Sequence, residues 1–325
     1  MNVGTVAVLR GGPSAEYSVS METGKGVIGV LNALHVKNKD IVISKTGQWL
    51  VQGFNKNPEQ ALADVDVVFI ALHGFYGEDG TVQRLLERLS IPYTGSQPYP
   101  SAIAMNKDLT KGYLKDLNVK TPRHMRVTKA GLTDPVQTAM SISELFGPKY
   151  VVKPTYGGSS IGMKVAQNAQ ELGTVLKELI AEHDDLLIEE YVSGREATVG
   201  ILENYREQEL YHLPSIEIIP PESAGYFAAE VKYNGETEEI CPGRFKENEK
   251  TEMAAAAQEV HRALGLRHYS RSDFIVAPDG IYFLEINTLP GLTSQSLFPK
   301  AIESVGGNYT DLIKHLLTQT GVSTL

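Results

Sequence analysis

Strand patterns alternate with loops and helix patterns at the start of this chain, and this alternation restricts the fold more than any other feature. Residues 5–9, 41–43 and 65–72 are apolar runs of strand length, and helix-like spacing of apolar residues appears at 18–34 and 80–89. A continuous apolar strand is typical of a parallel sheet whose two faces are covered by helices. The order of these segments therefore predicts an α/β layer built on a parallel sheet.

Two polar loops, residues 11–16 and 73–79, follow strands of this expected layer. The carboxyl ends of parallel strands line the usual ligand crevice, so both loops are candidates for binding. Glu16 either caps the next helix and complements its dipole or binds a cationic group of a substrate. His73 lies in the second loop, where a lone histidine is more often structural than chemical.

Later segments predict two further units of mixed α+β structure. A stretch rich in Pro, Gly and Ser at residues 92–101 suggests a boundary, and a strand-rich region with one amphipathic helix forms the last part of the chain. We therefore expect an N-terminal α/β substrate domain over residues 1–95 and a small α+β domain over residues 96–185. A larger α+β domain with a hairpin and a lid loop is expected over residues 186–325.

Composition excludes several classes of protein. Of the 325 residues, 30 are Lys or Arg and 39 are Asp or Glu, and the net charge of −9 lacks the positive field of a non-specific nucleic-acid or membrane binder. No apolar run approaches the ~20 residues of a transmembrane helix, and no signal-peptide pattern is present. The single cysteine, Cys241, excludes an intrachain disulfide framework and fits a reducing compartment. We therefore expect a cytoplasmic protein.

The sharpest chemical feature is a predicted β-hairpin, in which an Ala-Pro-Asp-Gly turn joins residues 269–276 to residues 281–286. Because side chains alternate between the faces of a strand, we expect one arginine and three oxygen-bearing side chains to converge: Arg271, Asp273, Glu285 and Asn287. Such oxygen ligands suit Mg²⁺, which prefers a few carboxylates together with substrate phosphates. The other interpretation is a polar outer face of a sheet with a salt bridge.

A loop rich in glycine and serine, residues 157–162, follows the expected strand at 150–153. Glycine lets backbone N–H groups approach an anion, serine hydroxyls add donors, and Lys153 supplies a positive charge. The loop matches neither the Walker A pattern nor the dinucleotide fingerprint. It is therefore either a phosphate-binding loop or an ordinary hairpin loop.

An acidic segment follows the expected strand at residues 186–188. It contains Glu189, Glu190, Val192 and, further on, Glu196. Backbone groups after a strand can pair with adenine, and a carboxylate can hold ribose hydroxyls. The alternative is a set of solvated acidic side chains at a strand end.

Short motifs along the chain, taken together, resemble the D-alanine–D-alanine ligase family of the ATP-grasp superfamily. They are GGPSAE at 11–16, ALHG at 71–74, GEDG at 77–80, YTGS at 93–96, KP at 153–154, GSSIG at 158–162, KY at 232–233 and EINTLPGLT at 285–293. The resemblance implies an ATP-grasp fold with an N-terminal parallel-sheet domain. It also implies ligation of two D-alanines through a D-alanyl phosphate, for peptidoglycan precursors.

The resemblance assigns roles residue by residue. ATP is held by Lys107, Lys153, Ser160, Glu189, Glu190, Val192 and Glu196. Two Mg²⁺ ions, which Mn²⁺ can replace, are bound by Asp273, Glu285 and Asn287. The residues nearest the reaction are Glu16, Ser159, Tyr233, Arg271 and Gly291. The amino acids are held by His73, Lys232, Ser296 and Leu297.

Residues 220–243 have the length and composition of a lid, which an acyl phosphate needs because water would hydrolyse it. Ala228 and Ala229 replace the Asp-Tyr pair that the family usually carries there, so we expect a lid more mobile than usual. Serines also flank Arg271, where the family usually has a glycine and an apolar residue.

Two other functions remain open. One is a related ligase that makes D-Ala–D-Lac or D-Ala–D-Ser, although Tyr233 favours an amine as the second substrate. The other is a catalytically silent nucleotide-binding sensor, against which the intact hairpin set argues. The resemblance further suggests a homodimer that uses ATP and D-alanine, without nucleic-acid or membrane partners.

Overall fold

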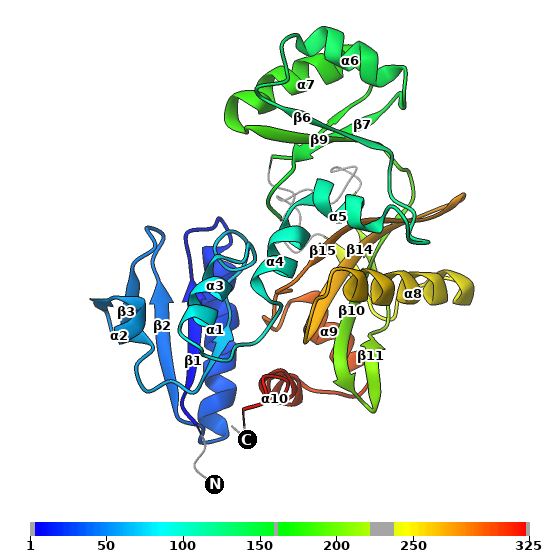
Figure 1. Ribbon diagram of the computed structural model, residues 1–325. Coiled ribbons are helices and arrows are strands. Elements are labelled where there is room, and N and C mark those ends of the chain that lie inside the picture. Colours follow the sequence, from blue (N-terminus) through cyan, green and yellow to red (C-terminus); the bar gives the residue numbers. More distant parts are fainter. Residues whose placement is uncertain (1–3, 159–161, 222–236, 323–325) are drawn as a thin grey trace.

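The computed structural model describes residues 4–158, 162–221 and 237–322. Three sheets organise the described chain, in the orders β4-β3-β2-β1-β5, β6-β9-β7-β8 and β13-β12-β10-β14-β15, with β11 paired to β10. The first sheet lies at the left of Figure 1, the second at the top and the third at the right. The predicted combination of a parallel-sheet layer with α+β units is therefore confirmed.

The N-terminal sheet has a parallel centre. Its parallel strands are β1 (Val6–Gly11), β2 (Asn38–Ile43) and β5 (Val67–Ile70). An antiparallel edge follows, with β3 (Trp49–Val51) and β4 (Phe54–Lys56). The helices of this part are α1 (Tyr17–Ala33), α2 (Pro58–Ala61) and α3 (Thr81–Arg88). The edge strands have three residues each, which is too short for an alternating pattern to stand out in the sequence.

The four-stranded sheet is antiparallel. Its strands are β6 (His124–Thr128), β7 (Tyr150–Pro154), β8 (Lys164–Ala166) and β9 (Asp185–Glu190). Figure 1 shows α6 (Pro135–Ser143) and α7 (Ala169–Glu182) together on one face of this sheet. The predicted limit at residue 185 falls on the first residue of β9, whose other residues also belong to this sheet.

Two helices lie between the first two sheets in the sequence, α4 (Pro98–Met105) and α5 (Lys107–Leu114). The predicted boundary at residues 92–101 is therefore only partly a loop. Pro98 occupies the first turn of α4, where the missing N–H costs nothing and the fixed backbone angle favours a helix.

The C-terminal sheet carries the predicted hairpin. Its strands are β10 (Arg195–Tyr205), β11 (Gln208–His212), β12 (Ile216–Ile219), β13 (Glu238–Ile240), β14 (Tyr269–Ala277) and β15 (Gly280–Asn287). The helices are α8 (Glu247–Ala263), α9 (Leu297–Ser304) and α10 (Tyr309–Thr318). Strands β14 and β15 pair antiparallel, as predicted.

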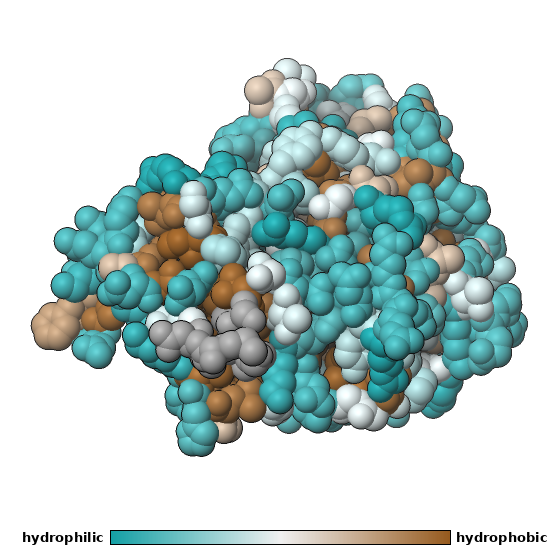
Figure 2. Space-filling model, turned by 60° about the horizontal axis from the view of Figure 1, so that its bottom comes forward, coloured by the Kyte–Doolittle hydropathy of each residue, from teal (hydrophilic) through white to brown (hydrophobic). Residues whose placement is uncertain are grey.

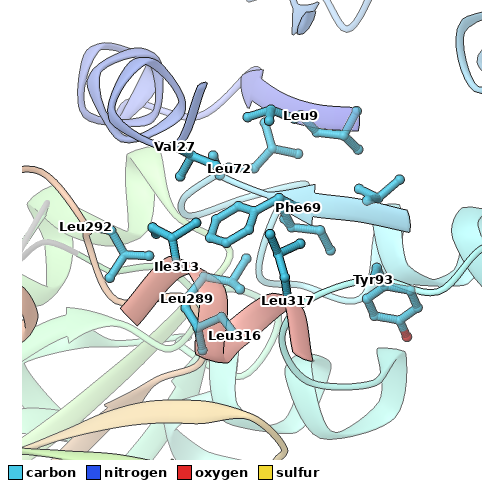
Figure 3. Packing of buried hydrophobic residues seen from close by; sticks show 14 of the residues in the cluster. Leu9, Val27, Phe69, Leu72, Tyr93, Leu289, Leu292, Ile313, Leu316 and Leu317 are labelled. Atoms are coloured by element: carbon cyan, nitrogen blue, oxygen red, sulfur yellow. The ribbon is translucent and has the colours of Figure 1, made fainter. Parts of the chain in front are cut away.

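The last helix packs against the first sheet. Figure 3 shows Ile313 and Leu317 of α10 facing Phe69 in a buried apolar cluster. Leu316 and Leu9 belong to the same cluster. Leu289 and Leu292, just after the hairpin, belong to the same cluster. The loop that follows β15 is thus anchored on the N-terminal layer, so residues from both ends of the chain meet at one place.

Figure 2 shows a face largely covered by hydrophilic residues, with apolar residues in smaller patches, as is usual for a globular protein. Within residues 4–158, 162–221 and 237–322, no helix has the length and apolar character required to span a membrane.

Candidate active site

A cleft of about 330 Å³ lies between the four-stranded and the six-stranded sheet. It brings together residues predicted from distant parts of the sequence: Lys107, Lys153, Glu189, Glu190, Val192, Glu196, Arg271, Asp273, Glu285 and Leu297. Apolar side chains also line it, among them Val151, Met163, Val165, Ile218 and Leu284. The sequence offers no signal for this apolar wall, because its residues look like ordinary strand residues until the sheets face each other.

The floor of the cleft is the β14–β15 hairpin. Its register pairs Asp273 with Glu285 and Arg271 with Asn287. The Arg271 guanidinium donates from Nε to Asp273 Oδ1 at 3.0 Å and from Nη2 to Oδ2 at 3.1 Å. The expected convergence is present, because a register shift between Asp273 and Phe274 places Glu285 rather than Leu284 opposite Asp273. Arg271 also makes the salt bridge that the other interpretation of the hairpin contained.

Neighbouring strands hold the Asp273 carboxylate in place. Thr198 of β10 lies opposite Asp273, and its hydroxyl donates to Oδ1 at 2.6 Å. Asn287 Nδ2 donates to Oδ2 at 3.3 Å. Thr198 is a functional candidate that the sequence does not reveal, since its partner lies 75 positions away.

The hairpin offers a chemically suitable site for a hard divalent cation. Among the described residues, no group of three or more His, Cys, Asp or Glu side chains is arranged to hold a metal. Asp273, Glu285 and Asn287 instead provide two carboxylates and one amide oxygen around one register position. This donor set fits Mg²⁺, which protein sites bind through one or two carboxylates while substrate phosphates supply further oxygens.

Buried lysines face the hairpin from the other side of the cleft. Lys107 Nζ lies 3.4 Å from Glu285 Oε2 and also donates to the carbonyl of Gly157. Lys153 Nζ lies 2.7 Å from Glu189 Oε2. Burial by itself would lower the pKa of Lys153, but the carboxylates of Glu189 and Glu285 raise it. Lys153 is therefore a cation beside the glycine-rich loop.

A second group of predicted residues lies beside the N-terminal sheet. Glu16 precedes α1, but its side chain makes no capping hydrogen bond. A Cβ atom at Gly74 would lie 2.6 Å from Glu16 Oε2, so the glycine makes room for the carboxylate. Glu16 therefore occupies the N-cap position of α1 without capping it through its side chain, and its carboxylate lies at the crevice.

His73 is buried and both of its ring nitrogens have partners. Nδ1 lies 2.9 Å from the Leu289 carbonyl and Nε2 lies 2.9 Å from Thr23 Oγ1. Because a carbonyl only accepts, Nδ1 carries the proton and Nε2 accepts from the threonine hydroxyl. Burial is the main cause of the lowered pKa of His73, and the positive charge of Arg271 lowers it further. The negative charge of Glu16 raises the pKa but does not outweigh the burial. His73 is a neutral link between the first sheet and the loop after β15.

Glu78 also binds the loop after β15. Its Oε1 accepts from the Gly74 N–H at 2.8 Å and its Oε2 from the Leu289 N–H at 3.3 Å. Burial and the nearby charge of Glu16 raise the pKa of Glu78 to about 7. The GEDG motif contains this residue, but the sequence does not reveal that it accepts from the Leu289 N–H while His73 donates to the Leu289 carbonyl.

The remaining predicted substrate residues follow on this loop. A Cβ atom at Gly291 would lie 2.9 Å from Ser296 Oγ, so a larger residue would displace that side chain. Ser296 Oγ accepts from the Thr293 N–H at 3.1 Å. Ser296 is also the residue directly before α9, which begins at Leu297. The sequence pattern did not predict α9, and its N-terminus presents backbone N–H groups near the cleft.

Several predicted residues lie outside the described part of the chain: Ser159, Ser160, Lys232 and Tyr233. The same holds for most of the predicted lid, including Ala228 and Ala229. Their roles and the expected mobility of the lid stay predictions. Gly157 and Gly158, at the start of the glycine-rich loop, do line the cleft.

Family models match most of the chain. The model described as "D-ala D-ala ligase C-terminus" matches residues 113–318, and that described as "D-ala D-ala ligase N-terminus" matches residues 52–96. Among solved structures, the D-alanine–D-alanine ligase from Bacillus anthracis complexed with ATP superposes with a TM-score of 0.80 at 30% identity, over 98% of this chain and 97% of that one. VanG D-Ala:D-Ser ligase from Enterococcus faecalis gives 0.84 at 26% identity, over 98% and 100%.

Curated relatives agree with the family models. The D-alanine–D-alanine ligase of Geobacter sulfurreducens is 38% identical over 315 residues, which cover 96% of this chain and 92% of the relative. That of Pelotomaculum thermopropionicum is 39% identical over 317 residues, covering 96% and 95%. These similarities extend over both family models and nearly the full length of each chain, and the chain therefore belongs to the D-alanine–D-alanine ligase family.

Proposed function

We propose that this protein joins two D-alanine molecules into D-alanyl-D-alanine and converts ATP into ADP and phosphate. One observation carries the proposal: the hairpin register gathers Arg271, Asp273 and Glu285 in a cleft that also contains buried lysines, with Asn287 paired to Arg271. The enzyme is thus an ATP-dependent carboxylate–amine ligase, and its product is a building block of peptidoglycan.

The nucleotide lies in the cleft between the two sheets. Its base rests on the apolar wall, and the segment from Glu189 to Glu196 holds the adenosine. Glu189 does so through its backbone, because its carboxylate is engaged by Lys111 and Lys153. Lys107 and Lys153 neutralise phosphate oxygens, while the loop containing Ser160 closes over them. Positioning and charge neutralisation are what phosphoryl transfer mainly requires from a protein.

Two Mg²⁺ ions, or Mn²⁺ in their place, are held by Asp273, Glu285 and Asn287. When bound, they supply positive charge that offsets the charge developing on the transferred phosphoryl group. Arg271 is fixed by its two hydrogen bonds to Asp273. Its guanidinium and the amide of Gly291 stabilise the oxyanion when the amine of the second D-alanine attacks the acyl carbonyl.

The two amino acids bind at the junction with the N-terminal sheet. Glu16 receives the ammonium group of the first D-alanine and is linked to Ser159 and Tyr233. The second carboxylate binds Ser296, Lys232 and the Leu297 amide, and the N-terminus of α9 favours an anion there. His73 supports this region by holding the loop after β15.

We also propose that the enzyme works in the cytoplasm as a homodimer, as the family resemblance suggests. Light scattering on the eluting peak of a size-exclusion column tests the dimer, since a mass of 35.5 kDa is expected for the monomer.

The proposed activity is tested by ADP release with D-alanine, D-serine, D-lactate and L-alanine in turn, with the products identified by mass. Release that depends on D-alanine and yields D-alanyl-D-alanine supports the proposal. A dominant D-alanyl-D-lactate or D-alanyl-D-serine product would assign the chain to a related specificity, and nucleotide binding without any dipeptide would favour a silent sensor.

A further inference from the structure

Lys111 is a buried cation for which the proposed reaction has no use. It lies on α5, one turn after Lys107, and its side chain has no solvent exposure. Its Nζ lies 2.8 Å from Glu189 Oε1, while Lys153 Nζ lies 2.7 Å from Glu189 Oε2. One carboxylate is therefore shared between a lysine that lines the cleft and a lysine that lies behind it.

Burying an ammonium group is costly unless a close counterion compensates for the lost hydration. Burial lowers the pKa of Lys111, and the charge of Glu189 opposes this effect. Burial would likewise raise the pKa of Glu189, but Lys111 and Lys153 together lower it to about 2. The carboxylate is therefore ionised, and both of its oxygens are engaged by cations.

The charges in this cluster do not balance. Lys107, Lys111 and Lys153 contact the carboxylates of Glu189 and Glu285, which leaves 3 − 2 = 1 positive charge. Without Lys111, each lysine of the cleft would have its own carboxylate in the nucleotide-free protein, and the cluster would carry no net positive charge. Asp273 does not alter this sum, because it pairs with Arg271.

The geometry points to Lys111 as a positioning residue for the nucleotide phosphates. Lys111 binds one oxygen of Glu189, so the carboxylate holds Lys153 in its orientation without fully neutralising its charge. The remaining positive charge of Lys153 is available to the phosphates of ATP. The inference deepens the proposed function and rests on its use of ATP. If Lys111 only supported the fold of the cleft, its loss would weaken the binding of the phosphates and of adenosine alike. In the proposed role, its loss weakens the binding of the phosphates and leaves the affinity for adenosine unchanged.

The test compares two ligands by isothermal titration calorimetry on the full chain: AMP-PNP with Mg²⁺, and adenosine. For Lys111→Met we expect AMP-PNP affinity to fall about tenfold or more while adenosine affinity changes less than about threefold, because only the triphosphate senses the lost charge. Lys115→Met, at the exposed residue directly after the same helix, is the matched control and should bind both ligands like the wild type.

A double variant tests the charge argument itself. Lys111→Met with Glu189→Gln leaves 2 − 1 = 1 positive charge, so the ratio of AMP-PNP to adenosine affinity should return to within about threefold of the wild type. Glu189→Gln alone leaves 3 − 1 = 2 positive charges and should raise that ratio. Glu189→Gln keeps Lys111, so it tests the charge argument even if the variants that lack Lys111 fail to fold.

Each result has a defined meaning. Equal AMP-PNP affinity in Lys111→Met and the wild type would overturn the inference, as would an equal loss for both ligands or a double variant whose ratio stays low. If the wild type itself binds no AMP-PNP, the proposed use of ATP fails instead, and the two failures are therefore distinguishable.

Discussion

His73 and Leu289 are joined by a 2.9 Å hydrogen bond between the ring Nδ1 and the backbone carbonyl, across 216 positions of the sequence. The bond fixes the tautomer of the histidine and connects the loop after β5 to the loop after β15. Glu78 holds the N–H of the same leucine. The segment that carries the Gly291 amide is thus positioned by the N-terminal layer.

Substitution of His73 tests this positioning role. Asn places a donor where Nδ1–H was, so we expect His73→Asn to keep kcat within about tenfold of the wild type. His73→Ala leaves the Leu289 carbonyl and Thr23 hydroxyl without their partner, which costs about 1–3 kcal/mol of stability, and kcat should fall further. Steady-state kinetics and urea unfolding measure both effects. A well-folded His73→Asn variant as inactive as His73→Ala would instead indicate a chemical role for the ring.

The raised pKa of Glu78 predicts a pH-dependent stability. Its pKa is about 7 in the folded protein and near the ordinary value of 4.5 when unfolded. The unfolded state therefore releases its proton first, so this contribution is full below about pH 4.5 and is lost as pH rises to about 7, by about 3 kcal/mol.

Urea unfolding between pH 5 and 8 checks this prediction. The free energy of unfolding of Glu78→Gln should fall less over that range than that of the wild type, because the glutamine does not titrate. Parallel pH profiles for the two proteins would contradict the assignment.

Thr198 should support the proposed metal site. Removing its hydroxyl in Thr198→Val leaves Asp273 Oδ1 without the 2.6 Å hydrogen bond, and loss of such a supporting contact typically weakens metal binding or activity about 10–100-fold. Thr198→Ser retains the hydroxyl and is the matched control. The Mg²⁺ concentration for half-maximal ADP release should rise in the valine variant alone. An unchanged Mg²⁺ dependence in that variant would show that the contact is dispensable.

Helix α10, at the far end of the chain, should stabilise the N-terminal layer by packing against it. Ile313 has no solvent exposure and lies in the cluster with Phe69 and Leu9. Ile313→Ala should therefore lower the free energy of unfolding by about 2–5 kcal/mol, while the exposed Thr318→Ala changes it by about 0.5 kcal/mol or less. Equal unfolding curves for the two variants would mean that the helix packs more loosely than described.

The hairpin shows what the sequence could predict. Alternation predicts that Asp273 shares a face with Arg271 and that Glu285 shares a face with Asn287. The short turn by itself would place Leu284 opposite Asp273, and it is a register shift between Asp273 and Phe274, which the sequence pattern does not reveal, that brings Glu285 there. Edge strands β3 and β4 could not be predicted in this way, because three residues do not establish a period.

The supporting residues of the site could not be predicted for a different reason. Each of these residues acts through a partner that is far away in the sequence, and the local pattern does not predict that partner. They are Thr198, Glu78 and Lys111. For Glu16 the local pattern was informative but ambiguous. Its position before a helix suggested a cap, but its side chain makes no capping hydrogen bond and lies beside Gly74, which has no Cβ to exclude it.

The proposed reaction requires that a D-alanine carboxylate become an acyl phosphate before the second amine attacks. D-Alanine labelled with ¹⁸O at both carboxylate oxygens tests this step, because the oxygen that attacks the γ-phosphorus leaves with the phosphate. We expect one ¹⁸O atom in each phosphate released together with a dipeptide. Unlabelled phosphate, released while D-alanyl-D-alanine forms, would contradict it.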